Sequence, residues 1–264
     1  MFGKKTNASK LFVGEQTLID FNILEALAGH HKDGFESAEP FPHMLFEDFI
    51  NPQGLTSLLD AFPSPDSDIA WRRADAVLGD APMQHKKLGM PNEIQMPSIL
   101  RQLIWELNSG IFIKFLEQLT GIQNLLPDPS LQGAGLHQSL PGAVLGIHAD
   151  FTHHKKYNLS RRLNILIYLN ENWREEYEGH LELWSKDMAG CVKRIMPIGG
   201  RCVIFKTDSN SYHGSPTPLN CPAGTTRKSI ALYYYTNGRG DTEVEPTKAT
   251  GWRNASRENL PAVE

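Results

Sequence analysis

The chain reads AVLGIHAD at residues 143–150 and RLNILIYLN at residues 162–170. Short runs rich in β-branched and aromatic residues, separated by turn residues, are typical of β-strands, and they continue to the end of this region. The further runs are GHLELW (179–184), KRIMPI (193–198), RCVIF (201–205) and KSIALYYYT (228–236). Several strands at such short intervals predict a sandwich or a barrel.

The sequence before these strands predicts helices and one early strand. Residues 1–40 predict a lead-in with one short helix, and FPHMLFEDFI at residues 41–50 predicts a strand. Asn51 and Pro52 then supply an N-cap and a first-turn proline for a helix that extends to about Phe62.

A second helical zone begins near Pro97, where apolar residues recur at spacings of three and four as far as Gly121. We expect a break in it around Ser109 and Gly110. Because helices precede strands, we predict a mainly β fold with supporting helices (α+β), whose core is a jelly roll.

The predicted organisation has three parts within a single structural domain. Residues 1–132 form a lead-in and helical support region, residues 133–240 form the jelly-roll core, and residues 241–264 form a C-terminal tail. No repeat of twenty to fifty residues is visible in the sequence, so one domain is the simpler interpretation.

Composition limits the partners that we expect. The chain has 264 residues and a formal net charge of -4, with a pI near 6.2, so no basic surface favours nucleic acid or an anionic membrane. The three cysteines are far apart and the N-terminus has no long apolar stretch, which together favour a cytoplasmic protein. The sequence leaves the oligomeric state open.

One histidine and one aspartate in AVLGIHAD are spaced as metal ligands would be. His148 and Asp150 are two residues apart on a predicted strand, so both side chains leave the same face. His213 follows the strand RCVIF, where a neighbouring strand of a jelly roll would bring it alongside. Two imidazoles and one carboxylate suit the Fe(II) of an oxygenase, with open positions for O2 and a bidentate 2-oxo acid.

Each of these residues also has an ordinary explanation when taken alone. His148 would be a hydrogen-bonded surface histidine, Asp150 a turn residue and His213 a loop histidine. Arg227 favours the metal site, because it begins the strand RKSIALYYYT and would enter the same interior, with Ser229 on the same face. A guanidinium pairs in bidentate fashion with a carboxylate, which suits the distal carboxylate of 2-oxoglutarate.

The motifs together resemble the prolyl-hydroxylase-like branch of the 2-oxoglutarate and Fe(II)-dependent oxygenases. The similarity runs from about Gln138 to Gly238 and rests on HAD at 148–150, RRLNILIYLN followed by Trp173, GHLELW, PIGGRCVIFKTDSNSYHGSP at 197–216, and RKS at 227–229. The resemblance implies a double-stranded β-helix, with His148, Asp150 and His213 as iron ligands and Arg227 as the anchor for 2-oxoglutarate.

The chain departs from the family at one position of the co-substrate pocket. Many members carry a tyrosine about ten residues before the first histidine, where this chain has Gln138. Asn164 and Tyr168, on alternate positions of one strand, are candidates for contacts with the co-substrate, and core packing is an equal alternative for Tyr168.

Other histidines in the region lie outside the predicted ligand set. The run from His153 to Lys156 predicts a solvated loop over the mouth of the site. His180 is expected to be structural, and His137 faces either the pocket or a turn.

The predicted activity is that of a 2-oxoglutarate-dependent dioxygenase that hydroxylates an unactivated carbon and releases succinate and CO2. Its cofactors would be Fe(II), 2-oxoglutarate and O2, with ascorbate as an accessory reductant, and Asp150 argues against halogenation, because family halogenases have a small residue there. The substrate would be a prolyl peptide or a small metabolite. The alternative is a non-catalytic, cupin-like jelly roll that binds a metal or another ligand.

Overall fold

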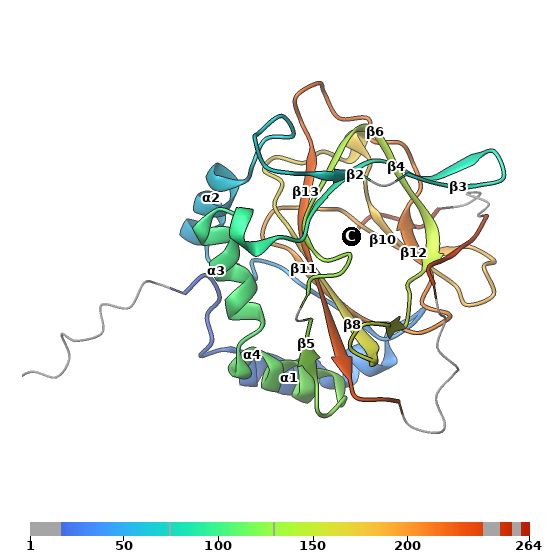
Figure 1. Cartoon of the computed structure of the whole chain (residues 1–264). Coiled ribbons are helices and arrows are strands. Elements are labelled where there is room, and N and C mark those ends of the chain that lie inside the picture. Colours follow the sequence, from blue (N-terminus) through green and yellow to red (C-terminus); the bar gives the residue numbers. More distant parts are fainter. Residues whose placement is uncertain (1–16, 74, 129, 240–248, 255–259) are drawn as a thin grey trace, which may run out of the picture.

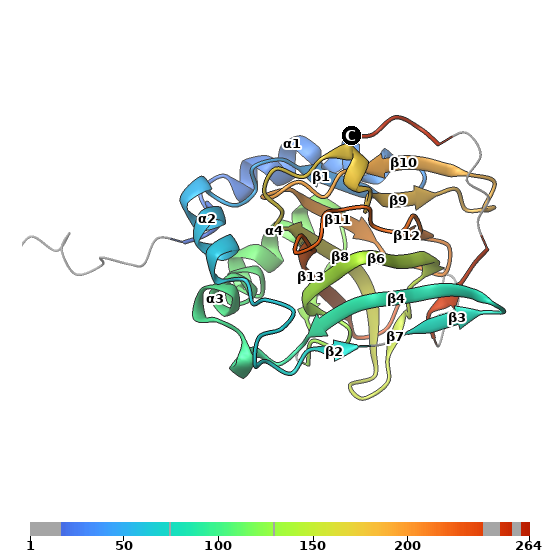
Figure 2. The same ribbon diagram turned by 90° about the horizontal axis from the view of Figure 1, so that it is seen from above.

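The computed structural model describes residues 17–73, 75–128, 130–239, 249–254 and 260–264 (Figure 1). Helices α1 to α4 lie along one side of a large curled β-sheet, an arrangement that is also visible from above in Figure 2. The helices have the bounds α1 Leu24–Ser37, α2 Pro52–Ala61, α3 Ser98–Leu107 and α4 Gly110–Thr120. Residues 1–16 of the expected lead-in lie outside the described part of the chain.

The ends of these helices follow the local signals in the sequence. The Asn51 side chain accepts a hydrogen bond of 2.7 Å from the Gly54 amide and so caps α2. Ser109 caps α4 through the Phe112 amide, which separates α4 from α3, and Gly121 ends α4 with a φ of 72°. The predicted helix after Asn51 and the predicted break in the second helical zone are both confirmed.

The strands supply most of the remaining structure. Their bounds are β1 His43–Phe46, β2 Arg72–Arg73, β3 Ala76–Leu78, β4 Ala81–Met90, β5 Leu126–Pro127, β6 Gly135–Ala149, β7 His153–His154, β8 Leu159–Tyr168, β9 Leu181–Trp184, β10 Cys191–Ile195, β11 Cys202–Lys206, β12 His213–Ser215, β13 Arg227–Thr236 and β14 Gly251–Trp252. Each predicted strand is present; most ends shift by a few residues, whereas β6 begins at Gly135, well before the predicted run that starts at Ala143.

The long strand β6 pairs with different neighbours along its length and so connects the two halves of the curled sheet. The strand order is β1-β11-β8-β13-β6-β12-β9-β10, and the named pairs are antiparallel. The first half of β6 pairs with β13, whereas its C-terminal end pairs with β12. The predicted mainly β fold with supporting helices is confirmed.

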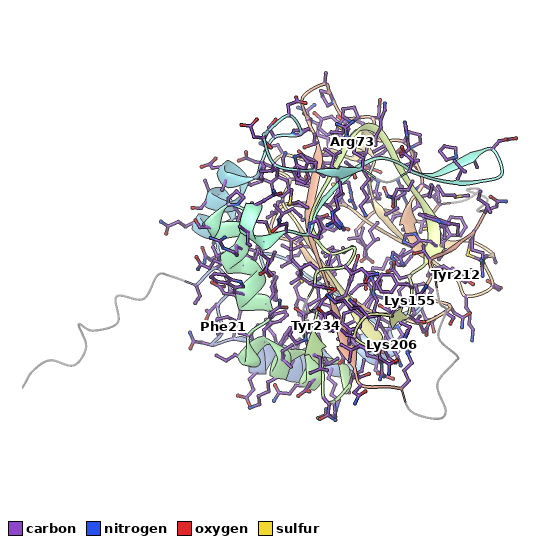
Figure 3. The ribbon with its side chains drawn as sticks, in the orientation of Figure 1. Phe21, Arg73, Lys155, Lys206, Tyr212 and Tyr234 are labelled. Carbon is purple, nitrogen blue, oxygen red and sulfur yellow. The ribbon has the colours of Figure 1, made fainter. Side chains whose placement is uncertain are left out.

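Aromatic side chains join the helices to the outer face of the sheet. Phe112 lies 6.2 Å from Phe49 and 6.4 Å from Tyr234, measured between ring centroids. The hydroxyl of Tyr234, labelled in Figure 3, donates a hydrogen bond of 2.8 Å to the carbonyl of Leu107 at the end of α3. This packing fixes β13, and with it the strand neighbours of β13, against the helical layer.

Three elements join the sheet from regions that the sequence assigns to the support region and the tail. The early strand β1 pairs with β11, β4 pairs with β6, and β14 pairs with the end of β6. Residue 240 of the expected core and residues 241–248 and 255–259 of the expected tail lie outside the described residues. The described helices include none that is long and apolar enough to cross a membrane.

Candidate metal centre

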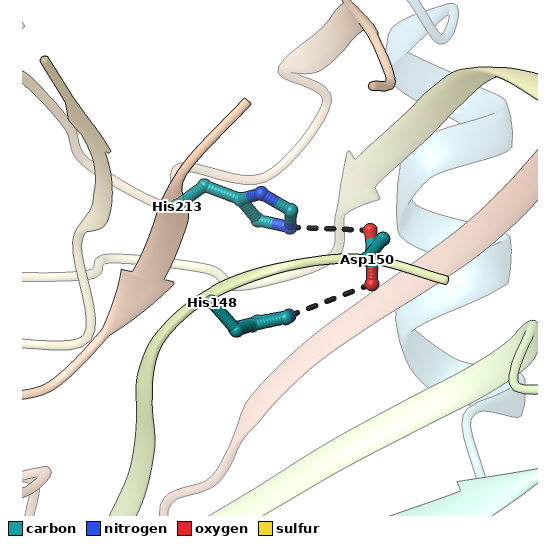
Figure 4. Close-up of side chains that lie close together, drawn as sticks. All are labelled: His148, Asp150 and His213. Carbon is teal, nitrogen blue, oxygen red and sulfur yellow. Dashed lines mark ion pairs between the residues drawn. The ribbon is translucent and has the colours of Figure 1, made fainter. Parts of the chain in front are cut away.

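The pairing of β6 with β12 brings the three predicted metal ligands together. His213 lies opposite His148 in the register, and their ring centroids are 4.6 Å apart. As Figure 4 shows, both imidazoles face Asp150, with 3.5 Å from His148 Nε2 to Oδ1 and 3.3 Å from His213 Nε2 to Oδ2. One ligand atom from each residue lies within 4.8 Å of the others, so a single ion can be shared.

The backbone fixes the tautomer of each histidine. Nδ1 of His148 lies 2.8 Å from the carbonyl oxygen of Gly146, and Nδ1 of His213 lies 2.9 Å from that of Ser211. A carbonyl only accepts, so each Nδ1 carries the proton and each Nε2 keeps a lone pair directed at the shared centre. Burial and the neighbouring His213 lower the pKa of His148, which favours the neutral form that binds metal.

The carboxylate of Asp150 is held in its charged form by two residues of β8. Oδ2 accepts hydrogen bonds of 2.9 Å from Arg161 and 2.6 Å from Asn164. Burial alone would raise the pKa of Asp150, but Arg161 and His213 outweigh it and hold the pKa well below its ordinary value. The donor set of two imidazoles and one carboxylate therefore fits a divalent transition metal such as Fe(II).

Arg161 was not predicted from the sequence, although it is fully buried at the site. Its guanidinium lies 3.3 Å from the ring centroid of Tyr233 and 4.6 Å from that of Phe151. The pairing of β8 with β13 skips Arg162, since Leu163 and Arg161 lie opposite consecutive residues. This bulge turns Arg161 to the face of Asn164, whereas simple alternation would have placed Arg162 there.

Asn164, Arg227 and Ser229, three of the four predicted co-substrate residues, line the same cavity as the three ligand candidates, whereas the fourth, Tyr168, is not part of its lining. The cavity, of about 330 Å³, is lined by the three ligand candidates together with Lys87, His137, Asn164, Arg227, Ser229 and Trp252. Arg227 donates from Nε to the Gly179 carbonyl at 2.6 Å and from a terminal nitrogen to the Tyr168 hydroxyl at 3.3 Å. Within the described ranges its guanidinium has no carboxylate partner, so donors remain for an anion.

Asn164 lines the cavity, whereas Tyr168 contacts it through Arg227. Asn164 also bonds to Asp150 and so orients its carboxylate. Tyr168 is fully buried beneath Arg227, with the guanidinium 4.9 Å from its ring centroid. Burial raises the pKa of Tyr168, which keeps the phenol neutral where it orients Arg227.

Gln138 stands at the family's tyrosine position and turns away from the cavity. Its amide donates to the Pro63 carbonyl at 3.2 Å and accepts from the Thr226 hydroxyl at 2.6 Å. Leu88 and Lys228 lie beside it in the sheet register. Gln138 therefore contributes packing, and the cavity wall beside it is formed by other residues.

The positions of the remaining histidines correct one prediction from the sequence. His154 is buried and lies 3.0 Å from the Ser130 hydroxyl, so the expectation of a solvated loop over residues 153–156 is wrong at this position, while Lys155 and Lys156 are exposed. His137 lines the cavity, and burial lowers its pKa well below the ordinary value. His180 is buried against Arg194, in keeping with a structural role.

Comparisons with known proteins agree with this geometry. Residues 134–235 match the model of the 2OG-Fe(II) oxygenase superfamily. No curated protein sequence matches the chain. A prolyl 4-hydroxylase structure from Phytophthora capsici is similar at 16% identity and a TM-score of 0.54, over 90% of this chain and 74% of that one. A Trichoplax adhaerens prolyl hydroxylase, in complex with a hypoxia inducible factor peptide fragment, is similar at 15% identity and a TM-score of 0.53, over 81% of this chain and 91% of that one.

The two solved structures are similar to this chain in fold, and the family model is similar to it in sequence. The matched residues run from the start of β6 almost to the end of β13, and they include the three ligand candidates and Arg227. The enzymes of this superfamily use Fe(II), 2-oxoglutarate and O2. Residues 134–235 of this chain therefore match the 2-oxoglutarate and Fe(II)-dependent oxygenase superfamily in sequence, and the match and the site together support a 2-oxoglutarate-dependent dioxygenase.

Proposed function

We propose that His148, Asp150 and His213 bind Fe(II) and that the protein hydroxylates an unactivated carbon of its substrate. When bound, iron and 2-oxoglutarate supply the oxidising chemistry: the co-substrate is decarboxylated to succinate and CO2, one oxygen atom of O2 enters succinate, and the other enters the substrate. The observation that carries the proposal is that the three ligand candidates and Arg227 line one cavity.

The protein's own contribution to metal binding is to hold three donors in place before the metal arrives. The carbonyl oxygens of Gly146 and Ser211 fix the two imidazole tautomers. Arg161 and Asn164 keep Asp150 ionised and fix its orientation. Such outer hydrogen bonds reduce the reorganisation that metal binding would otherwise require.

Arg227 and Ser229 are the proposed anchors for the distal carboxylate of 2-oxoglutarate. The guanidinium is oriented by the Gly179 carbonyl and by Tyr168, and it retains donors that no described carboxylate occupies. Ser229 is two residues along the same strand and lines the same cavity. Tyr168 acts through Arg227 and is a positioning residue.

The substrate class that we propose is a prolyl peptide or a small metabolite. The similar Trichoplax adhaerens structure holds a peptide fragment, which supports a peptidyl substrate for this fold. All three cysteines are free thiols, which supports a reducing compartment, and we propose the cytoplasm. We retain the division at residues 132 and 240 as a proposal about organisation.

A non-catalytic, cupin-like module is the alternative in another functional class. It would use the same histidines for a metal, but it has no need for an arginine with free donors beside them. The match to the oxygenase family and the place of Arg227 in the cavity both favour the enzyme.

The test is succinate formation by the purified protein with Fe(II), O2, ascorbate and 2-oxoglutarate. We expect iron-dependent succinate in the wild type, increased by the correct member of a panel of prolyl peptides and metabolites. His148→Ala and Asp150→Ala should abolish it, while the exposed His85→Ala serves as a matched control. Full iron-dependent activity in either ligand variant would refute the assignment.

A further inference from the structure

Lys87 lies in the same row of the sheet as the co-substrate anchor. Ser139 of β6 is opposite Lys87 of β4 on one side and opposite Arg227 of β13 on the other. All three residues line the cavity. Neighbouring strands are about 4.8 Å apart, so the Lys87 backbone is roughly 10 Å from that of Arg227, within reach of a long side chain.

An irregularity in the pairing of β4 with β6 comes directly before Lys87, which lines this cavity. The register with β6 shifts between His85 and Lys87, and Lys86 adopts a positive φ of 54°. The Lys86 ammonium bonds outside the cavity to the Pro141 carbonyl at 3.3 Å. A bulge of this kind changes the direction of the side chain that follows it, here that of Lys87.

The ammonium group of Lys87 lacks a partner of its own. Within the residues that the structure describes, it makes no hydrogen bond and no ion pair, and its charged neighbours are Asp150, Arg227 and Arg161. Burial lowers the pKa of Lys87 to about 8. A desolvated cation without a counterion is unfavourable, so an anion that enters the cavity would be stabilised there.

The cavity would still carry excess positive charge after 2-oxoglutarate binds, and Lys87 is one of its sources. Asp150 is the sole acidic residue among the described residues that line the cavity, whereas Arg72, Lys87 and Arg227 are basic. With Fe(II) bound, the charges of the metal, Arg161 and Arg227, less that of Asp150, come to +3, and the two carboxylates of 2-oxoglutarate balance only two of these. Among the described residues, neither Lys87 nor Arg72, which lies on the exposed strand β2 beside β4, then has a counterion.

We propose that Lys87, with Arg72 at the rim, binds an acidic group of the primary substrate, which is a carboxylate or a phosphate ester. The inference rests on the proposed function, because it assigns 2-oxoglutarate to Arg227. It narrows the substrate class: a neutral or basic metabolite, or a prolyl segment without a nearby acidic group, would leave the two cations unmatched.

The test measures the binding of matched probes to protein that is saturated with Ni(II) and 2-oxoglutarate, so that no turnover occurs. The pairs are N-acetylproline with N-acetylprolinamide, acetyl-Pro-Glu-amide with acetyl-Pro-Gln-amide, and O-phosphoserine with serine. Tryptophan fluorescence can report binding, because Trp252 lines the cavity. The first two pairs test a carboxylate, and the third tests a phosphate.

We expect the acid of at least one pair to bind about tenfold more tightly than its neutral partner, as a charge-assisted hydrogen bond provides. Lys87→Gln should reduce that preference to below about twofold, whereas Lys86→Gln should retain it. The proposal is overturned if no pair shows a preference, if neither member of any pair binds, or if the preference survives in Lys87→Gln.

Two further outcomes separate this inference from the proposed function. If Lys87→Gln weakens 2-oxoglutarate binding as much as Arg227→Gln does, Lys87 belongs to the co-substrate site and the inference is wrong. Iron-dependent succinate formation by the wild type, measured without any probe, tests the proposed function by itself. Because the probes are read with Ni(II), charge preference remains measurable even if that activity fails.

Discussion

The orientation of the Asp150 carboxylate depends on hydrogen-bond donors from neighbouring side chains. Asn164 donates to Oδ2 at 2.6 Å, and its own oxygen accepts from Arg161 and from the Thr207 hydroxyl. Asn164 therefore links Asp150 to a buried polar network in which each described member is oriented by another. Such networks lose much of their effect when one member is removed.

We predict that Asn164→Ala lowers the metal affinity by roughly 10- to 100-fold, the usual cost of removing an outer hydrogen bond from a ligand. The reason is that Asp150 would lose a charge-assisted donor and part of its fixed orientation. Competition between Mn(II) and a chelator measures the affinity. Asn220→Ala, at an exposed position, is the control, and equal affinities in all three proteins would contradict the prediction.

A second prediction concerns the distal carboxylate of the co-substrate. Arg227→Gln should raise the apparent KM for 2-oxoglutarate by roughly 30-fold or more, since loss of a buried charge pair costs about 2 kcal/mol or more. Turnover of 2-oxovalerate, which lacks that carboxylate, should change little. Metal affinity should be retained, and Arg174→Gln at an exposed ion pair is the control. An unchanged KM would remove Arg227 from this role.

At the level of elements, the site depends on the close approach of β12 to β6. A Cβ atom added to Gly214 would lie 2.6 Å from the Gly146 carbonyl oxygen and 2.7 Å from that of Leu145. No side chain fits there without a shift of backbone. The absence of a side chain at Gly214 is thus part of what holds His213 opposite His148.

Gly214→Ala should therefore separate the two strands. We expect a loss of about 1–3 kcal/mol in the free energy of unfolding, typical of overpacking, together with weaker metal binding. Gly190→Ala is a matched control, because a Cβ there meets no atom within 4 Å. Urea unfolding and metal titration measure the two effects; if Gly214→Ala behaves like the control, the close approach is not required.

The elements also explain how far the sequence could predict the site. His148, Asp150, His213 and Arg227 were predicted together because they lie at or beside strands with clear apolar patterns. Their assembly in one cavity is what the structure adds. The sequence shows no alternation that would identify β4, because its run APMQHKKLGM mixes polar and apolar residues on both faces.

Arg161 and Lys87, which the sequence did not predict, face the site because each lies beside an irregularity in strand pairing. Arg161 reaches Asp150 because β8 skips one residue in its pairing with β13, and Lys87 enters the cavity because β4 shifts its register after His85. A bulge reverses the expected face of a side chain and leaves no regular mark in the sequence. Charged residues on otherwise apolar strands were the available signal for Arg161.

For the whole molecule, buried histidines couple stability to pH. Burial lowers the pKa of His43, His137 and His148 below the ordinary value of 6.5. In the unfolded chain these groups take up protons near pH 6.5, whereas in the folded protein they do so at lower pH. The unfolded state therefore binds more protons as the pH falls below about 6.5, and the stability of the metal-free protein decreases through that window.

We predict a lower urea midpoint for the metal-free protein at pH 5.5 than at pH 7.5. One proton that is bound only by the unfolded state contributes about 1.4 kcal/mol per pH unit. His43→Gln should reduce this pH dependence without touching the candidate metal centre, because His43 lies on β1. The same dependence in wild type and variant would show that His43 does not contribute.

The central claim, that one cavity holds Fe(II) and 2-oxoglutarate for oxidative decarboxylation, is tested most directly by release of CO2 from 2-oxoglutarate labelled in the carboxylate next to the keto group. We predict labelled CO2 and succinate in equal amounts, dependent on Fe(II) and O2, and absent in Asp150→Ala. Tight iron binding by the wild type with no release of labelled CO2, whatever substrate candidate is added, would contradict the account.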